Sequence, residues 1–516
     1  MRVAIRVDAS VEIGSGHVMR CLTLAEELQS RGNEVTFICR NHNGNLGKFI
    51  GDLGYNVTLL SSAIANSGNS NIKSENKSHL GVEQEVDAKQ TADALCGKSI
   101  DWIIVDHYSL DSEWHKYMYA FCKNIMVIDD LANRKYECDL ILDQTYGVDE
   151  ESYKDLVPSR CRILTGSSNA LLRTQFLHLR EVALNIREEQ GRVNRVLVTM
   201  GGMDPDNVTL TVINGLLQVE WNGDVEINIV LGQHAPHLEQ IRSIQSTDFI
   251  KVNVISNVNN MAELMLNSDI AIGAGGTTSW ERCCMGLPTL MVISAENQVN
   301  IINKLSQDGI VINLGWHHVL ECLDIKEAIE GLIDKPEEIL LMSKKSFSVC
   351  DGLGLYRVLA DLHPVTNVHG QSVTLRSASI KDINTIYQWQ CEPNTRKYFN
   401  NKSIPTEKEH NDWMRSKLDD LRGYFNIILC EGIPSGVIRL EPIIENDDEY
   451  MVSILIDPNC YNRGIGYAAL DIVRCMLPKA VFHAEILVDN ESSMNLFRKA
   501  GYKFQEASGH FVSTPV

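Results

Sequence analysis

An apolar strand, a glycine-rich turn and an amphipathic helix in direct succession constrain the fold of this chain more than any other feature. Val3, Ile5 and Val7 recur at strand spacing, the turn follows at 12–17, and apolar residues then recur at helical spacing over 19–28. Further short apolar runs lie at 34–39, 102–106, 125–129 and 139–143. Strands that alternate with helical-length segments predict a parallel sheet with crossover helices.

A second series of the same kind begins near residue 193. Its apolar runs, two of which lead into glycine turns, lie at 195–202, 225–232, 250–256, 269–281 and 288–294. Two similar α/β halves with a cleft between them predict a two-lobed, glycosyltransferase-B-like region. Ligands of open parallel sheets bind outside the carboxyl ends of the strands. Two such ends that face each other would form one site.

The chain changes character after the second series. Residues 361–373 have little apolar periodicity and contain Pro364 and Gly370, so we interpret them as a linker. A Ser/Asn-rich stretch at 61–78 is predicted to be a long surface loop. We therefore predict three units, namely a Rossmann-like lobe at 1–168, a second Rossmann-like lobe at 190–363 and an α+β domain at 374–516.

The balance of charge limits what the chain can bind. Lys and Arg total 47 against 67 Asp and Glu, and this net charge of −20 disfavours broad contact with a nucleic-acid backbone. The 14 cysteines include no Cys-x-x-Cys pair, so we expect reduced thiols and no metal site. Charges in the opening strand and the lack of an apolar run of about 20 residues argue against a signal peptide and a membrane span. We expect a cytoplasmic protein with small-molecule partners, and the oligomeric state stays open.

The turn Gly14-Ser15-Gly16-His17 is the first candidate binding element. Two glycines between a strand and a helix let the backbone approach a ligand closely, and the first N–H groups of the helix attract an anion. The imidazole of His17 would face that ligand, and imidazole suits general acid–base work near neutral pH. The alternative is a turn that serves packing alone.

Three further elements follow predicted strand ends in the second half. They are the turn Gly201-Gly202, the turn Gly275-Gly276 with the hydroxyls of Thr277 and Thr278, and the amides of Asn297 and Gln298. Glu281 lies one turn into the helix after the second turn, where a carboxylate can accept hydrogen bonds from ribose hydroxyls. Glycine turns at several strand ends in two facing lobes predict a nucleotide-diphosphate site.

Seven motifs lie in order along both lobes, at 8–28, 106–114, 127–144, 171–176, 199–207, 273–281 and 295–298. Together they resemble the UDP-sugar hydrolases of pseudaminic acid biosynthesis over residues 1–365. The resemblance implies hydrolysis of UDP-2,4-diacetamido-2,4,6-trideoxy-β-L-altropyranose, with inversion, without a metal and with release of UDP. It also implies that His17 is the active-site histidine and that the second-lobe turns bind uracil and diphosphate. Arg20, in the first motif, joins the substrate-binding candidates.

An inverting hydrolysis has requirements that follow from its chemistry. Water displaces the leaving group in one step from the opposite face of the sugar. UDP leaves as a stable anion, which the N–H groups of the glycine turns would stabilise. Neutral His17 is the best candidate to deprotonate the water. Asp8 and Asp106, each at a predicted strand end, could orient the water, His17 or a sugar hydroxyl, or could serve only as caps.

A second binding element lies in the third unit. A strand at 450–457 is followed by an Arg-x-x-Gly-x-Ala pattern, whose amides at a helix start can hold the pyrophosphate of coenzyme A. With the downstream motif at 488–504, it resembles the Gcn5-related N-acetyltransferases over residues 374–510, in particular those that acetylate a UDP-4-amino-sugar of the same pathway. The resemblance implies acetyl-CoA as co-substrate. The candidate cofactor-binding residues are Ile456, Arg463, Gly464, Gly466, Tyr467, Ala468, Asn490, Ser493 and Phe497.

Phe497 departs from the family pattern. Many members have a tyrosine there that protonates the departing thiolate, so the identity of the acid stays open. The attacking amine must be neutral, which requires a base or a chain of waters. Glu441 and Glu485 are possible bases, or merely solvated carboxylates on strands.

The sequence thus predicts a bifunctional enzyme that acetylates a 4-amino UDP-sugar and hydrolyses the acetylated product. Two alternatives stay open. A glycosyltransferase of the same two-lobed architecture would move the sugar to an acceptor other than water. A nucleotide-sugar binding protein would have one or both sites degenerate. The intact turn at 14–17 argues against degeneracy of the first site, whereas Phe497 leaves it open for the second.

Overall fold

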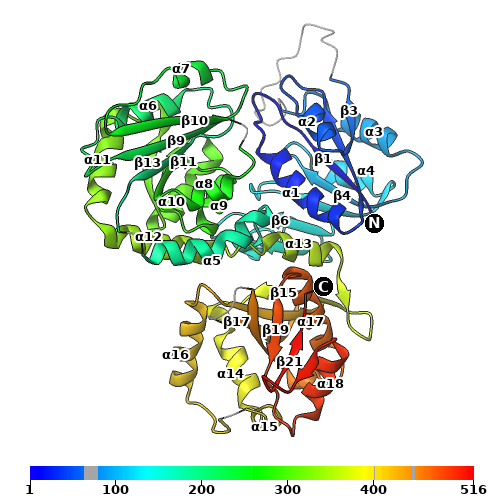
Figure 1. Cartoon of the computed structure of the whole chain (residues 1–516). Coiled ribbons are helices and arrows are strands. Elements are labelled where there is room, and N and C mark those ends of the chain that lie inside the picture. The colour runs from blue at the N-terminus through cyan, green and yellow to red at the C-terminus, as the bar shows by residue number, and fades with distance from the viewer. Residues whose placement is uncertain (63–78, 190, 257, 400, 444–447, 516) are drawn as a thin grey trace. The chain divides into compact units, whose positions relative to one another are not determined.

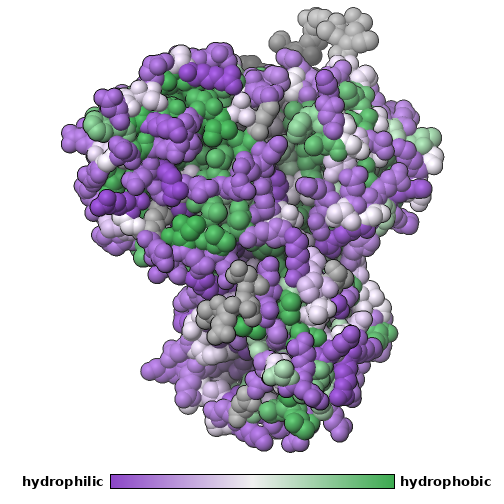
Figure 2. Space-filling model, in the orientation of Figure 1, coloured by the Kyte–Doolittle hydropathy of each residue, from purple (hydrophilic) through white to green (hydrophobic). Residues whose placement is uncertain are grey.

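The computed structural model describes residues 1–62, 79–189, 191–256, 258–399, 401–443 and 448–515. It contains two compact units, Met1–Leu355 and Tyr356–Val516. Nearly all of the stretch predicted as a surface loop, 61–78, lies outside the described residues. No helix in the described part of the chain is long and apolar enough to cross a membrane. Hydrophilic side chains cover much of the face seen in Figure 2.

Seven parallel strands form the sheet of the first lobe, in the order β3-β2-β1-β4-β5-β6-β7 (Figure 1). The strands are β1 (Arg2–Val7), β2 (Glu34–Arg40), β3 (Asn56–Leu60), β4 (Ile100–Asp106), β5 (Cys122–Ile128), β6 (Leu140–Asp143) and β7 (Arg162–Thr165). The helices between them are α1 (Gly16–Ser30), α2 (Gly47–Asp52), α3 (Gln84–Leu95) and α4 (Ser112–Met118). Consecutive residues of the central strands are buried, because crossover helices cover both faces of a parallel sheet.

Six parallel strands form the sheet of the second lobe, in the order β10-β9-β8-β11-β12-β13. The strands are β8 (Arg195–Thr199), β9 (Val225–Leu231), β10 (Ile250–Ser256), β11 (Ile270–Ala274), β12 (Thr289–Ile293) and β13 (Val311–Trp316). The helices are α6 (Val208–Leu216), α7 (Leu238–Arg242), α8 (Met261–Leu266), α9 (Thr278–Cys284), α10 (Val299–Gln307), α11 (Cys322–Ile333) and α12 (Pro336–Val349). Helix α5 (Thr174–Glu188) leads from the first sheet to the second and packs against α8, α9 and α12.

Both sheets reverse their strand order at one point, between β1 and β4 in the first lobe and between β8 and β11 in the second. The crevice outside the carboxyl ends of the strands at such a reversal is where open α/β sheets bind ligands. Asp8 and Asp106 lie at the ends of the first pair of strands, and the turns at 201–202 and 275–276 follow the second pair. The topology therefore brings the residues predicted from the sequence to the two places in the fold that favour binding.

Eight strands form the mixed sheet of the second compact unit, in the order β14-β15-β16-β17-β18-β19-β21-β20. The strands are β14 (Val365–Thr366), β15 (Ser372–Ser377), β16 (Tyr424–Cys430), β17 (Ile433–Pro442), β18 (Glu449–Ile456), β19 (Val481–Ala484), β20 (Lys503–Gln505) and β21 (His510–Ser513). The helices are α14 (Ile383–Cys391), α15 (Pro393–Arg396), α16 (Glu407–Leu418), α17 (Ile465–Met476) and α18 (Glu491–Lys499), and α13 (Gly354–Leu362) spans the boundary between the two units. Only β18 and β19 pair in parallel; the other pairs between the described strands of this sheet are antiparallel.

The segment predicted to be a linker, 361–373, has more structure than its sequence indicated. Helix α13 ends inside it, and β14 pairs antiparallel with β15 through Val365 and Val373. A strand of two residues carries no detectable alternation of apolar residues, so the pattern on which strand prediction depends was too short to see.

Helices α6 and α11 approach closely at Gly215, and this contact can be tested. A Cβ on Gly215 would lie 2.6 Å from the Cβ of Ile325 and 2.8 Å from the carbonyl oxygen of Cys322. We expect Gly215→Ala to lower the free energy of unfolding by about 1–3 kcal/mol, because the helices must move apart. Unfolding in urea measures the change.

Gly331→Ala is the matched control, because Gly331 lies in α11 and a Cβ there would meet nothing within 4 Å. This control should raise the free energy of unfolding by up to about 1 kcal/mol through helix propensity. Equal effects of the two substitutions would contradict the close contact between the helices.

Candidate functional site

Four aspartates stand at the ends of four neighbouring strands of the first sheet. Asp8 follows β1, Asp106 ends β4, Asp129 follows β5 and Asp143 ends β6, and all four are buried. The carboxyl ends of parallel strands share one edge of the sheet, so the four carboxylates line that edge. A buried carboxylate needs a partner, and each of the four is paired with a cation or accepts hydrogen bonds.

His17 and Arg20, in the first turns of α1, both reach Asp106. The Nδ1 of His17 lies 2.6 Å from one carboxylate oxygen, and Arg20 donates hydrogen bonds to both oxygens, each at 2.6 Å. The two side chains share a face of the helix because they are three residues apart. The predicted catalytic residues His17 and Asp106 are therefore in direct contact.

The charges around Asp106 keep this carboxyl group ionised. Burial alone would raise its pKa, but Arg20 and His17 outweigh burial and hold the pKa of Asp106 below its usual range. A carboxylate that accepts the Nδ1 proton leaves the lone pair of a neutral imidazole on Nε2. The side chain of His17 is 15% exposed, so the ring is not sealed from solvent.

Tyr108 and Asp130, which the sequence patterns did not single out, lie around this group. The ring of Tyr108 packs edge-on against His17 with 4.8 Å between the ring centroids. Asp130 lies 3.7 Å from a terminal nitrogen of Arg20. Burial and the charge of Asp130 raise the pKa of Tyr108, so its hydroxyl stays neutral. Both residues follow strand-end aspartates, and that position is the signal that could have identified them.

Asp8 lies in an ion pair inside the first lobe. Arg6 donates hydrogen bonds to both of its oxygens, at 2.5 and 2.9 Å. Burial alone would raise the pKa of Asp8, but Arg6 holds it well below its usual range. The Nε2 atoms of His107 and His42 lie 3.3 and 3.7 Å from one Asp8 oxygen. A role for Asp8 in orienting water, His17 or a sugar hydroxyl stays a prediction.

The glycine turns of the two lobes face each other. A Cβ on Gly16 would lie 3.9 Å from the hydroxyl of Thr277, and a Cβ on Gly202 would lie 3.8 Å from the hydroxyl of Ser15. Gly14 has a φ of +79°, which favours glycine. Helix α1 begins without a side-chain cap, so its first N–H groups are available to an anion. The first-lobe turn therefore lies against two turns of the second lobe.

Glu281 lies in α9, three residues after Thr278 opens that helix, and is held by Arg173. A terminal nitrogen of Arg173 lies 3.2 Å from one carboxylate oxygen. Burial raises the pKa of Glu281, and Arg173 acts in the opposite direction. The sequence pointed to Glu281 but not to Arg173, since 108 residues separate the two in the chain.

Close packing leaves no room for a side chain at Gly275. A Cβ on Gly275 would lie 2.7 Å from Ile302 and 3.3 Å from the Cβ of Gln298. The amides of Asn297 and Gln298 have different surroundings. The side-chain oxygen of Gln298 accepts a hydrogen bond from the N–H of Ser294. Asn297 is exposed. Gln298 thus holds the local turn, while Asn297 presents its side chain to solvent.

In the C-terminal unit, β18 and β19 pair in parallel only from Glu449–Val481 to Met451–His483. Strand β18 continues to Ile456, so the two strands separate along its second half. Helix α17 begins next to Gly464, whose φ is +76°. The predicted cofactor-binding residues Arg463, Gly464, Gly466, Tyr467 and Ala468 lie at this helix start, where the backbone N–H groups suit a pyrophosphate.

The motif at 488–504 contains helix α18, including its cap Asn490 and its buried residue Phe497. Asn490 caps this helix, since its side chain accepts a hydrogen bond from the N–H of Ser493 at 3.1 Å. Phe497 is buried and packs edge-on against Tyr502, with 4.9 Å between the ring centroids. The hydroxyl of Tyr502 is buried without a hydrogen-bond partner among the described residues. The identity of the acid for the thiolate stays open.

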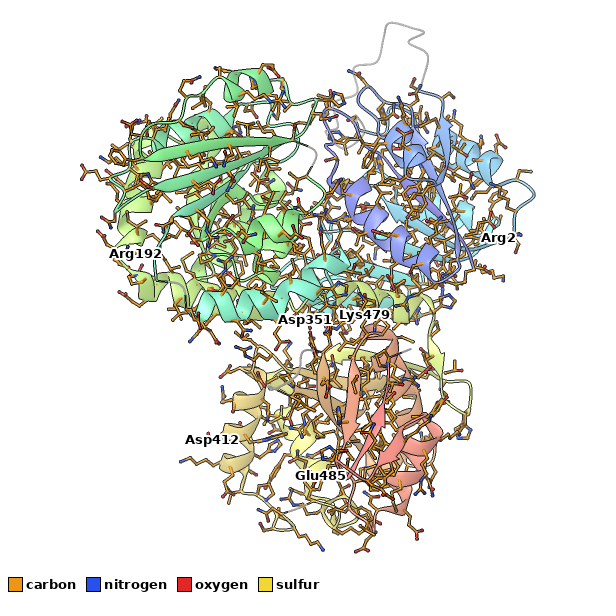
Figure 3. The ribbon with its side chains drawn as sticks, in the orientation of Figure 1. Arg2, Arg192, Asp351, Asp412, Lys479 and Glu485 are labelled. Carbon is orange, nitrogen blue, oxygen red and sulfur yellow. The ribbon has the colours of Figure 1, made fainter. Side chains whose placement is uncertain are left out.

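The two carboxylates considered as bases differ in their surroundings. Glu441 lies 2.5 Å from the ammonium of Lys417 and 3.2 Å from the guanidinium of Arg439. Burial alone would raise the pKa of Glu441, but these cations lower it, which makes Glu441 a poor base. Glu485 directly follows β19 and is exposed (Figure 3).

Cysteines and metal ligands add no further group to the site. All 14 cysteines are free thiols, as the scattered spacing predicted. Within the described ranges, no three His, Cys, Asp or Glu side chains are grouped so that they could hold a metal ion.

Comparisons with known proteins match the two parts of the chain separately. Residues 195–352 match the family model "Glycosyltransferase family 28 C-terminal domain", and residues 372–503 match the "Acetyltransferase (GNAT) domain". An uncharacterized protein of Methanocaldococcus jannaschii is 24% identical over 98% of this chain and 97% of its own length. Acinetobacter baumannii MurG has a similar fold, with 14% identity and a TM-score of 0.50 over 70% of this chain and 99% of MurG.

The UDP-2,4-diacetamido-2,4,6-trideoxy-β-L-altropyranose hydrolase of Campylobacter jejuni is 24% identical to this chain, over 60% of the chain and 97% of the hydrolase. This similarity, the fold shared with MurG and the GNAT match confirm the predicted resemblance and the predicted fold class. The chain is a fusion of a two-lobed, glycosyltransferase-B-like region, similar to the Campylobacter jejuni hydrolase, with a C-terminal domain that matches the GNAT acetyltransferases.

Proposed function

We propose that the two-lobed region hydrolyses UDP-2,4-diacetamido-2,4,6-trideoxy-β-L-altropyranose to the free sugar and UDP without a metal ion. The contact between His17 and Asp106, next to glycine turns from both lobes, is the observation that carries the proposal. The likeness to the Campylobacter jejuni hydrolase supports the choice of substrate. Membership of a wider group of nucleotide-sugar enzymes is supported by the match at 195–352.

The proposed mechanism is a single displacement by water. Asp106, held by Arg20, accepts a hydrogen bond from Nδ1 of His17, so the proton of the neutral ring stays on Nδ1. Nε2 then takes a proton from water as the water oxygen attacks the anomeric carbon. The bond from that carbon to the diphosphate oxygen breaks, UDP leaves with the electron pair, and the configuration inverts. N–H groups at the glycine turns stabilise the charge on the leaving group. His17 then releases its proton to solvent.

The second lobe supplies groups that suit the nucleotide. The N–H groups at 275–277 and the hydroxyls of Thr277 and Thr278 are suited to the diphosphate. The carboxylate of Glu281, oriented by Arg173, is suited to accept hydrogen bonds from ribose hydroxyls. In this arrangement UDP binds to the second lobe, and the sugar extends toward His17.

We infer that residues 374–516 transfer an acetyl group from acetyl-CoA to the 4-amino group of the UDP-sugar precursor. The GNAT match supports acetyl transfer, and the helix start at Gly464 supports a pyrophosphate site. The product of this reaction would be the substrate of the two-lobed region. Both substrates are water-soluble metabolites, which fits the cytoplasmic location expected from the sequence.

A glycosyltransferase is the second candidate, because residues 195–352 match the glycosyltransferase family 28 C-terminal domain. Turnover in isotopically labelled water distinguishes the two reactions. Free sugar that carries the label supports hydrolysis, whereas sugar joined to an unlabelled acceptor supports transfer. Binding of the UDP-sugar without any turnover would instead indicate a binding protein. Phe497 leaves such a loss of activity open for the acetyltransferase domain only.

We expect His17→Ala to lower the rate of UDP release by about 100-fold or more, because the attacking water loses its base. UDP should still bind with nearly unchanged affinity, since the glycine turns and Glu281 are intact. UDP release and calorimetric binding of UDP measure the two effects. His237→Ala is the control, because this half-buried histidine contacts a loop carbonyl at Pro205. Near-normal turnover of His17→Ala would refute the assignment.

We expect Arg463→Glu to raise the KM for acetyl-CoA about tenfold or more, because it reverses the charge next to the proposed pyrophosphate site. Tenfold corresponds to about 1.4 kcal/mol of binding free energy. Release of free thiol in the presence of the 4-amino UDP-sugar measures KM. Arg415→Glu, on the exposed end of α16, applies the same change of charge elsewhere in the domain. An equal rise in both variants would argue against a local effect.

A further inference from the structure

The separation of β18 from β19 leaves an open strand edge that leads to one histidine. Pairing ends at Met451 and His483, and Val452–Ile456 offers about 16 Å of strand edge beyond that point. The other edge of β18 stays paired with β17 as far as Ile456. His483 therefore lies at the closed end of the gap between the two strands.

Helix α17 lies along the open part of this gap. A Cβ on Gly466, in the first turn of α17, would lie 3.6 Å from the Cδ1 of Ile454 on β18. If the N–H groups at this helix start hold the pyrophosphate, the rest of acetyl-CoA can follow the open edge of β18. The thioester then reaches the closed end of the gap, next to Met451 and His483.

His483 points to the face of the sheet opposite α17. Side chains alternate along β18, so Met451 and Leu455 share one face, and Ile454 faces α17. Leu455 packs in the core formed with α14 and α16. His483 is in register with Met451 and therefore lies on the face of Leu455. An acceptor on this face and a cofactor held by α17 would meet at the closed end of the gap.

Glu449 orients the imidazole of His483. The Nε2 of His483 lies 2.9 Å from a carboxylate oxygen of Glu449, and the two side chains are 14% and 27% exposed. If Nε2 carries the proton and donates it to Glu449, the lone pair of the neutral ring is on Nδ1. Nδ1 makes no hydrogen bond to a side chain or backbone group in the described part of the domain. In this tautomer Nδ1 can accept a proton, while Glu449 holds the ring through Nε2.

Neither His510, which contacts the ring of His483, nor Glu441, which is in register with Met451, provides an equivalent base. His510 on β21 contacts the ring of His483 with 6.1 Å between centroids, but it lies one strand further from β18. Glu441 on β17 is in register with Met451 and is paired with Lys417 and Arg439. These cations hold Glu441 in its ionised, weakly basic form.

We propose that His483, oriented by Glu449, is the base that takes the proton from the acceptor amine in the acetyl transfer. This inference rests on the function proposed for residues 374–516. Nδ1 of His483 accepts a proton from the ammonium group of the acceptor, and the neutral amine attacks the carbonyl carbon of acetyl-CoA. The C–N bond forms, the C–S bond breaks, and the sulfur leaves with the electron pair. The second amine proton goes to the thiolate or to solvent, and the products are amide, free CoA and one proton.

Acetyl transfer by the full-length chain to the 4-amino UDP-sugar, followed through free thiol from pH 6 to pH 10, tests the proposal. We expect His483→Gln to lower kcat about 100-fold or more near neutral pH. Its remaining rate should rise toward high pH as the free amine accumulates, while calorimetry shows acetyl-CoA affinity within about twofold of wild type. His510→Gln is the matched control, and we expect it to keep the wild-type pH profile.

Glu449→Gln provides an independent measurement if His483→Gln does not fold. An amide in place of the carboxylate weakens the hydrogen bond that orients the imidazole, so kcat near neutral pH should fall about tenfold or more and should recover toward high pH, where the free amine accumulates. Wild-type profiles for both Glu449→Gln and His483→Gln would overturn the role of His483 while leaving the acetyltransferase function intact. A wild-type chain that binds acetyl-CoA but acetylates no amino sugar nucleotide would refute the function itself, and the inference with it.

Discussion

The two hydrogen bonds from Arg20 to Asp106 are the interaction on which the candidate hydrolytic site depends. Asp106 ends a central strand and is buried, where a lone carboxylate would be strongly disfavoured. Arg20 supplies the opposite charge and fixes both oxygens, so one of them can also bind Nδ1 of His17. The orientation of His17 therefore follows from an ion pair inside the lobe.

The reversal of strand order explains why this contact lies at a binding site. Each sheet reverses between two central strands, β1 and β4 in one lobe and β8 and β11 in the other. Helices on either side of a reversal run away from each other, which leaves room above the strand ends. Above the strand ends, Ser15 and Gly16 of the first lobe lie close to Gly202 and Thr277 of the second. Backbone groups of both lobes can thus contact one anionic ligand.

In the acetyltransferase domain, backbone groups become accessible to a ligand where two neighbouring strands separate. Its sheet stays continuous, but β18 and β19 separate after Met451 and His483. The start of α17 lies on one face of the sheet, the pair of His483 with Glu449 lies on the other, and the open edge of β18 lies between them. The pair joins neighbouring strands at the point of separation, so the same strand register that opens the gap also positions the imidazole.

Much of the first site was predictable because its signals are local. The turn at 14–17, the strand-end position of Asp106 and the glycine turns of the second lobe are all encoded within a few residues, and they lie where the patterns indicated. The fold class was predictable for the same reason, since alternating strands and helices of this length form a parallel sheet. The sequence did not predict β14, because a strand of two residues is too short to show an alternation of apolar and polar residues.

The sequence by itself determined which segments become strands, turns and helices, and which residues stand at the strand ends. Only the tertiary structure decided which side chains become partners. Arg20 binds Asp106 from 86 residues away, Arg173 binds Glu281 from 108 residues away, and His483 meets Glu449 across a strand pair. The physical reason is that local spacing fixes the direction of a side chain along its own element. The order and register of the strands fix which distant side chain it meets.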